Sequence, residues 1–142
     1  MSQTVPSSMQ APSQLLSGAV PLVGRILLGA IFLISGFGKI AAPAAAVGYI
    51  ASAGLPLPQV GLAVGIAIEV IGGILLIAGY QTRIVAGVFA AYCLATAALF
   101  HNNLADQNQF VHFFKNVAMA GGMLQVLAFG AGRLSLDAWR TR

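Results

Sequence analysis

Glu69 is the residue best placed to do chemistry, because it is a lone carboxylate near the middle of the apolar stretch Val60–Gly79. An ionised side chain at the centre of a bilayer costs about 2.5–3.5 kcal/mol, so it must face protein or water and needs a partner. Gly65, Gly72 and Gly73 lie at helical spacing around it, and small residues in this pattern let another helix approach closely. We therefore expect Glu69 to point into a helix bundle, either as a proton acceptor or ligand anchor in a cavity or as half of a structural ion pair.

Arg25 and Lys39 are the two basic residues of the first apolar stretch and could both reach towards Glu69. They are 14 residues apart, which places them within about 40° of each other on one helical face. Both are candidate contacts for the polar head group of a ligand in the cavity. The alternative for each is ordinary snorkelling of a long side chain at a helix end.

A second group of polar residues gathers where the third and fourth apolar stretches meet. His101 and Lys115 are candidate cavity or head-group contacts, and with Asp106 and His112 they would form a polar rim. The alternative is a plain solvated loop. Two histidines and one aspartate without regular spacing predict no metal site. Tyr92, in the third stretch, could hydrogen-bond a ligand but is better interpreted as linking helices.

The composition says what kind of fold must position these residues. Of the 142 residues, 58% are hydrophobic and 7% are charged, against about 25% charged in an ordinary soluble domain. The mean hydropathy of +0.89 agrees with an integral membrane protein and excludes a soluble globule. The net charge of +4 comes from scattered basic residues, so no nucleic-acid partner is expected. Cys93 is the single cysteine, which argues against thiol–disulfide exchange.

The apolar stretches predict an all-α, integral membrane four-helix transmembrane bundle. Each candidate span has the length of about 20 residues that a bilayer requires, and they run over Ala19–Ile40, Val60–Gly79, Arg83–Phe100 and Phe110–Ala131. Lys115 lies inside the fourth and would have to snorkel. Five of the seven Lys and Arg residues fall on one side if both ends face the cytoplasm, so an N-in/C-in topology is favoured.

The regions outside the bundle follow from the same pattern. Residues 1–18 are predicted to be a disordered N-terminal tail, residues 19–132 the transmembrane domain, and residues 133–142 a short cytoplasmic interfacial tail. Asp137 is predicted to cap a short interfacial helix that contains Trp139. The loop between the first two spans is expected to hold a short turn around Val47–Ser52.

Several of these motifs, taken in order, resemble the DoxX family over residues 22–137. The resemblance rests on five segments: Arg25–Gly29 through Ser35–Lys39, Glu69 followed by Gly72-Gly73, Gly79–Arg83, Lys115-Asn116, and Ser135–Asp137. It implies a multi-pass, four-helix protein of the bacterial inner (cytoplasmic) membrane. Some DoxX-like proteins are linked to quinone-dependent sulfur oxidation or to membrane oxidoreductase complexes, and others to stress responses or to no known activity. The resemblance transfers no established catalytic residues.

Together these features suggest a cavity for a quinone-like or other amphiphile, with Glu69 as the proton acceptor. The chain shows no motif for a flavin, a nicotinamide or an iron–sulfur centre, and no covalently bound cofactor is implied. Electrons would then come from an oxidoreductase partner subunit or from a soluble donor, and the chain would be a membrane subunit of a quinone-dependent oxidoreductase. The alternatives are a small-molecule or lipid transporter and a purely structural membrane scaffold. The lipid bilayer is an expected partner, and the glycine pattern also permits a homo-oligomer.

Overall fold

A computed structural model describes residues 13–141, and all regular structure in this range is helical. The all-α fold class is thereby confirmed. The elements in chain order are η1 (Leu15–Ala19), α2 (Val20–Ala41), α3 (Pro43–Ser52), α4 (Pro58–Ile66), η2 (Ala67–Ile71), α5 (Gly72–Ala78), α6 (Thr82–Phe100), α7 (Gln107–Phe129) and α8 (Leu136–Arg140).

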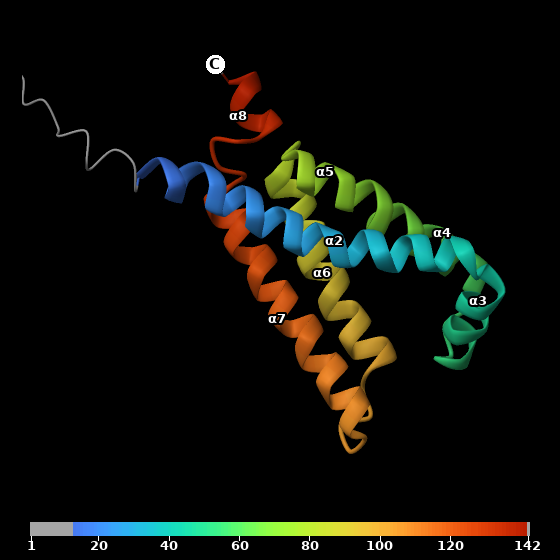
Figure 1. Ribbon diagram of the computed structural model, residues 1–142. Coiled ribbons are helices and arrows are strands. Elements are labelled where there is room, and N and C mark those ends of the chain that lie inside the picture. Colours follow the sequence, from blue (N-terminus) through green and yellow to red (C-terminus); the bar gives the residue numbers. More distant parts are fainter. Residues whose placement is uncertain (1–12, 142) are drawn as a thin grey trace, which may run out of the picture.

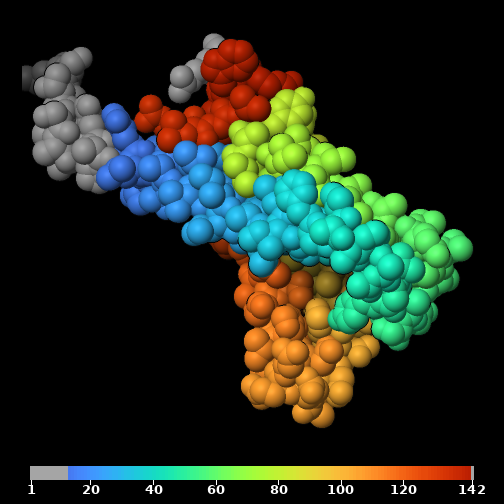
Figure 2. All heavy atoms as spheres, turned by 45° about the vertical axis from the view of Figure 1, so that its right-hand side comes forward, coloured from blue at the N-terminus to red at the C-terminus, as the bar shows by residue number. Residues whose placement is uncertain are grey.

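The helices form two antiparallel pairs that converge at one end and diverge at the other. The rod made of η1 and α2 packs along a second rod made of α4, the π-helical turn η2 and α5, while α6 packs along α7 (Figure 1). α8 lies at the convergent end, beside the end of α5. At the divergent end α3 comes alongside the α6–α7 hairpin (Figure 2), where the rings of Tyr49 and Phe100 stack with centroids 5.4 Å apart.

Three helical segments of the described residues are long and apolar enough to cross a membrane. They are Leu15–Ala41, Pro58–Ala78 and Thr82–Phe100. α7 is 23 residues long, but polar side chains in its N-terminal half make it less apolar. It runs back along α6, so the two described ends of the chain meet at the convergent end (Figure 1). The fourth crossing and the N-in/C-in orientation stay predictions.

The two rods touch through glycines, as the small-residue pattern around Glu69 predicts. A Cβ added at Gly36 of α2 would lie 2.7 Å from Val70 Cγ2 and 3.1 Å from Glu69 Cβ. In the opposite direction, a Cβ at Gly73 would lie 2.8 Å from Leu33 Cδ2. The distances of 2.7 and 2.8 Å are shorter than carbon atoms tolerate without a shift of the neighbouring group, so these glycines set how closely the rods approach.

Gly36→Ala is expected to lower the free energy of unfolding by about 1–3 kcal/mol, because overpacking of a well-filled contact costs this much. The added methyl group would push α2 away from the turn that carries Glu69. Gly38→Ala is the matched control, since nothing lies within 4 Å of its added Cβ. Detergent-solubilised variants unfolded by SDS titration would reveal the difference. Equal stability of the two variants would show that the contact is not tight in solution.

The contact between the two pairs is an apolar core centred on α6. The rings of Phe32 and Phe89 stack with centroids 4.0 Å apart, and Leu76, Cys93 and Met123 are completely buried around them. Cys93 is thus a packed core side chain. This core joins α2 and α5 to the α6–α7 hairpin and fixes the angle at which the two pairs diverge.

The N-terminal boundary differs from the prediction. Residues 15–18, assigned from the sequence to the disordered tail, are helical in η1, whereas residues 1–12 lie outside the described residues. Pro21 gives a physical reason for the π-helical geometry of η1, because it has no N–H to donate to the carbonyl of Ser17. The N–H of Arg133 donates to that oxygen instead, at 2.7 Å. The first interhelical segment also differs: it is the ten-residue helix α3 rather than a turn at Val47–Ser52.

The prediction that Asp137 caps its own short helix is wrong. Ser135 caps α8, because its hydroxyl oxygen accepts a hydrogen bond from the N–H of Ala138 at 3.1 Å. The Asp137 carboxylate reaches the start of α6 and accepts from the N–H groups of Gln81 and Thr82 at 2.8 and 2.9 Å. Two otherwise unpaired amides at the positive end of a helix favour a carboxylate at this place. The C-terminal segment is therefore docked on the bundle.

Asp137→Ala is expected to lower the free energy of unfolding at about pH 7 by about 1 kcal/mol, the usual value of a lost helix cap. Burial opposes ionisation of this carboxyl, but the hydrogen bonds from Thr82 and Gln81 and the charge of Arg140 outweigh it, so the pKa of Asp137 lies below its ordinary value. A lowered pKa contributes stability above the unfolded-state value of about 3.9, which is lost as the pH falls through the folded-state value.

The difference between the wild type and Asp137→Ala should consequently shrink as the pH falls below about 4. Thermal unfolding in detergent over this pH range measures it. Asp106→Ala is a useful comparison, because the Asp106 carboxylate caps only its own helix, accepting from the N–H of Gln109. A difference for Asp137→Ala that is independent of pH would contradict the role of the charge.

Candidate functional site

The most prominent polar site in the described part of the chain is an ion pair between Lys39 of α2 and Glu69 of η2. The ammonium nitrogen of Lys39 lies 2.8 Å from Oε1 and 2.7 Å from Oε2 of Glu69. Glu69 is only 4% exposed, whereas the side chain of Lys39 is 26% exposed. The pair joins the two rods near the divergent end, and the carboxylate is the more deeply buried partner.

Two hydroxyl groups complete the network around the ion pair. Tyr92 of α6 donates its phenolic proton to Oε1 of Glu69 at 2.7 Å, and the Lys39 ammonium also lies 2.7 Å from the hydroxyl oxygen of Ser35. An ammonium group has three protons. Those of Lys39 are matched by three acceptors, so Lys39 is committed to holding Glu69, while the carboxylate keeps lone pairs that can accept further hydrogen bonds.

Glu69 lies in a π-helical turn that interrupts an otherwise regular α-helix. The turn spans Ala67–Ile71 and separates α4 from α5. Such single turns widen the helix locally and occur frequently at functional sites. The turn changes the direction in which the side chains before and after it point. Gly65 can therefore lie beside the Tyr92 hydroxyl, while Gly72 packs on the ring of Phe89.

Glu69 and Lys39 line a cavity of about 660 Å³ at the divergent end of the bundle. The cavity is bounded by α2, α3, α4, α6 and α7, and its walls are mainly apolar, formed by side chains such as Ile31, Ile50 and Met119. The polar groups are concentrated in two places, at the ion pair and at the mouth. They are Ser35, Lys39, Glu69, Tyr92, Thr96, His101, His112, Lys115 and Asn116. The volume falls within the range typical of small-molecule sites.

The mouth of the cavity carries a stacked pair of histidines. The rings of His101 and His112 lie with centroids 5.0 Å apart, and Nδ1 of His101 is 3.1 Å from Oε1 of Gln109. Lys115 makes no hydrogen bond or ion pair with any residue that the structure describes. The mouth thus presents an ammonium group and an imidazole whose donors are available to a ligand.

A comparison with known proteins identifies the family. The DoxX family model matches residues 20–102, which include Lys39, Glu69 and Tyr92. The chain belongs to the DoxX family. Two relatives from Escherichia coli K12 extend the match: inner membrane protein YphA is 36% identical over 121 residues, and inner membrane protein YqjF is 37% identical over 119 residues. Each alignment covers 82% of this chain, with 86% of YphA and 88% of YqjF.

These relatives and the apolar helices establish this DoxX chain as an inner-membrane protein, whose environment is the lipid bilayer. No solved structure matches the chain significantly. The family match ends before α7, so His112 and Lys115 come from a part of the cavity that the family model does not cover. The ion pair lies wholly inside the matched region.

The DoxX fold brings together four of the five residues singled out from the sequence. Glu69, Lys39, His101 and Lys115 all line the one cavity. Arg25 does not join them, although it lies on the same face of α2. Fourteen residues correspond to about 21 Å along a helix, so Arg25 is at the level of the end of α5 instead.

Arg25 is 1% exposed and binds backbone carbonyls at the convergent end. Its guanidinium donates to the carbonyls of Leu76 at 3.0 Å and Ile77 at 2.7 Å, and also to that of Leu134. These are carbonyls at the end of α5 and in the loop before α8. The positive φ of Gly79 and its missing side chain leave room for the guanidinium. Arg25 therefore joins α2, α5 and the C-terminal segment, and the expectation that it lines the cavity is wrong.

Tyr92 belongs to the site, although the sequence interpretation treated it mainly as a residue that links helices. It does link helices, as expected, but it does so through the Glu69 carboxylate and inside the cavity. The signal available was the position of a hydroxyl-bearing side chain in the middle of an apolar helix. His112 also proves to line the cavity, whereas Asp106 of the expected rim caps α7.

Proposed function

We propose that the cavity binds a quinone-like amphiphile and that Glu69 exchanges a proton with its head group. The observation that carries this proposal is a buried carboxylate, held by Lys39 and Tyr92, inside a cavity of about 660 Å³ with mainly apolar walls. An amphiphile with a polar ring and an apolar chain matches this division of polar and apolar surface.

The hydrogen-bonding groups suggest how such a head group would be held. Because the three protons of Lys39 are already used, the donors for carbonyl oxygens of the ligand are Lys115 and the imidazoles of His101 and His112. Glu69 has free lone pairs and would accept from a hydroxyl group of the reduced form. A carboxylate within hydrogen-bonding reach of such a hydroxyl can act as a general base.

The wider role that we propose is that of an oxidoreductase-associated membrane subunit. Glu69, Lys39 and Tyr92 supply binding and proton transfer, and a partner subunit supplies the redox group. With both chain ends in the cytoplasm, as the distribution of Lys and Arg predicts, the cavity mouth at His101 and Lys115 faces the outer side of the membrane. Four crossings of the membrane, with α7 as the last, are part of this proposal.

The test is to purify the protein in mild detergent and to identify retained lipid-soluble molecules by mass spectrometry. Gly38 lines the cavity and has open space around its Cβ position, so Gly38→Leu should fill the site without displacing the ion pair. Gly48→Leu is the matched control, because this α3 glycine also has open space but does not line the cavity. We expect a quinone in the wild type and the control, and none in Gly38→Leu.

A protein that retains no quinone, and whose thermal stability is unaffected by added quinone, would overturn the proposal. Retention of a different amphiphile that Gly38→Leu removes would shift the assignment to transport or lipid handling. Equal retention by Gly38→Leu and the wild type would place any bound quinone outside this cavity.

A further inference from the structure

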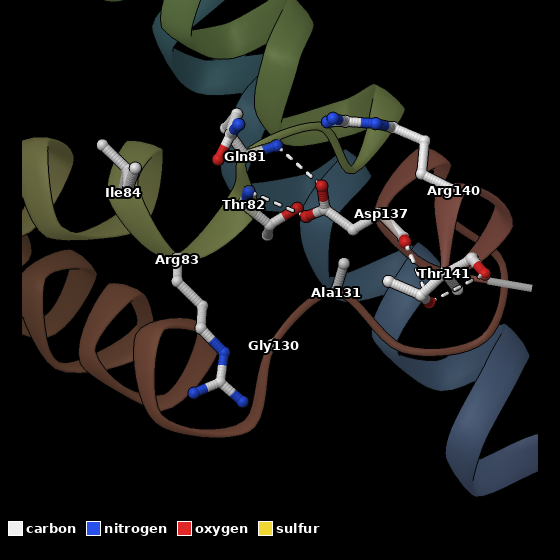
Figure 3. A pocket seen from close by; sticks show the side chains of 10 residues that line it. Gln81, Thr82, Arg83, Ile84, Gly130, Ala131, Asp137, Arg140 and Thr141 are labelled. Atoms are coloured by element: carbon white, nitrogen blue, oxygen red, sulfur yellow. Dashed lines mark hydrogen bonds between the residues drawn. The ribbon is translucent and has the colours of Figure 1, made fainter.

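A second pocket, of about 530 Å³, lies at the convergent end of the bundle, away from the Glu69 cavity. It is formed by the start of α6, the loop after α7 and the α8 helix (Figure 3). The polar residues that line it are Gln81, Thr82, Arg83, Asp137, Arg140 and Thr141. None of these residues takes part in the proposed quinone site.

The charged side chains of this pocket differ in whether they already have an interaction partner. The Asp137 carboxylate is used by the backbone amides of Gln81 and Thr82. Arg83 makes no hydrogen bond or ion pair within residues 13–141, and Arg140 lies over the ring of Tyr80, with its guanidinium carbon 5.1 Å from the centroid. Figure 3 shows Arg83 and Arg140 on opposite sides of the opening, with Asp137 between them. The pocket is therefore an anion-attracting site in which one guanidinium has no partner among the described residues.

The surroundings of the pocket include exposed apolar side chains, and the pocket lies at the end of a helix that is apolar enough to cross a membrane. Arg83 and Ile84 belong to the first turn of α6, one of the helices apolar enough to cross the membrane. Ile84 lines the pocket and is 66% exposed. Phe129 and Trp139 do not line it but are adjacent in sequence to residues that do, and they are 80% and 73% exposed. Tryptophan is enriched at the level of lipid head groups. A ligand in this pocket would thus meet guanidinium groups at its head and apolar side chains beside it.

We infer that this pocket binds the head-group phosphate of an anionic phospholipid. Guanidinium groups recognise phosphate oxygens with paired hydrogen bonds, and basic pockets at the ends of membrane helices bind anionic lipid head groups. Arg83 provides a guanidinium that has no partner among the described residues, Arg140 adds a second positive charge, and Ile84 offers an exposed apolar side chain to an acyl chain. A lipid fits this combination better than a soluble phosphate, which would make no use of the exposed apolar side chains.

The experiment uses the full chain in detergent, with phosphatidylglycerol as the probe and native mass spectrometry as the readout. Arg83→Gln and Arg140→Gln should each weaken phosphatidylglycerol binding about fivefold, the usual contribution of one basic residue near anionic lipid. Arg133→Gln is the matched control: it removes the same charge from the same end of the protein, but residue 133 does not line the pocket. Its binding should stay within about twofold of the wild type. Phosphatidylcholine should bind weakly to all variants.

Two results would overturn the inference. If Arg133→Gln lowers binding as much as Arg83→Gln, the lipid responds only to the overall positive charge of this end. If glycerol 1-phosphate, which carries the phosphate without acyl chains, displaces phosphatidylglycerol at equal concentration, the site recognises a soluble phosphate compound. Circular dichroism of each variant verifies that the helical content is retained. We expect this for Arg83→Gln because Arg83 has no hydrogen bond or ion pair with the described residues. Arg140→Gln loses the contact with the Tyr80 ring and the charge beside Asp137, but the two backbone hydrogen bonds to the Asp137 carboxylate remain.

Discussion

Glu69→Gln should lower the free energy of unfolding by about 3 kcal/mol, as is found when one partner of a buried ion pair is removed. The substitution keeps the shape of the side chain but leaves the Lys39 ammonium without its counter-charge in a largely apolar cavity. It also leaves the Tyr92 hydroxyl with a weaker acceptor. SDS titration of the detergent-solubilised protein, followed by circular dichroism, measures the change.

The double variant Lys39→Met/Glu69→Gln separates this effect from a general loss of packing. Replacing both partners removes the uncompensated charge, so most of the lost stability should return. We expect Glu69→Gln to lose quinone, because the head group loses its proposed contact with the carboxylate, and the double variant should not regain it. If the two substitutions were simply additive in their effect on stability, Lys39 and Glu69 would not form the coupled pair that the geometry indicates.

Arg25→Met should be nearly as damaging, at about 3 kcal/mol, although it lies far from the cavity. The substitution leaves the carbonyls of Leu76, Ile77 and Leu134 without their charged donor, and hydrogen bonds to charged groups contribute about 1.5–3 kcal/mol each. The C-terminal segment loses one of its attachments. Limited proteolysis after Arg133 should therefore become faster, in addition to a fall in unfolding free energy.

Arg25→Lys is the informative comparison for that prediction. A lysine keeps the positive charge but cannot direct a planar, forked set of donors at several carbonyls, so it should recover only part of the stability. Full recovery by lysine would mean that the charge alone matters at this position. An unchanged rate of proteolysis in Arg25→Met would mean that the segment is held by Asp137 and by the N–H of Arg133, which donates to the Ser17 carbonyl, without help from Arg25.

The sequence could predict the helices and the buried carboxylate because both depend on local physical rules. Apolar length defines a membrane helix, and an isolated carboxylate in such a helix needs a partner. The choice between Arg25 and Lys39 as that partner was not predictable from angular position, since both share the face of α2 that meets the second rod. The choice depends on which basic residue lies at the same level along the helix axes as Glu69. The length of the connection between the rods and the π-helical turn at Glu69 together set this level.

The C-terminal segment illustrates a second reason why part of the structure escaped prediction. The distance in sequence between Asp137 and its partner Thr82 is 55 residues, and nothing in the local pattern distinguishes a carboxylate that caps its own helix from one that caps another. Pro21 is a similar case. Its sequence position predicts that the Ser17 carbonyl lacks its helical donor, but not that the N–H of Arg133 binds this carbonyl. Long-range backbone pairing of this kind depends on the completed fold.

The docking of residues 133–137 on helices that precede them has a consequence for biogenesis. During synthesis the first three membrane helices emerge from the ribosome before this segment does. Until it emerges, Arg25 lacks the Leu134 carbonyl as an acceptor, and the amides at the start of α6 lack the Asp137 carboxylate. Residues 133–137, which are translated after all the bundle helices, therefore close the assembly. A chain that stops short of them would present an incompletely satisfied buried arginine to the membrane proteases that dispose of unfinished proteins.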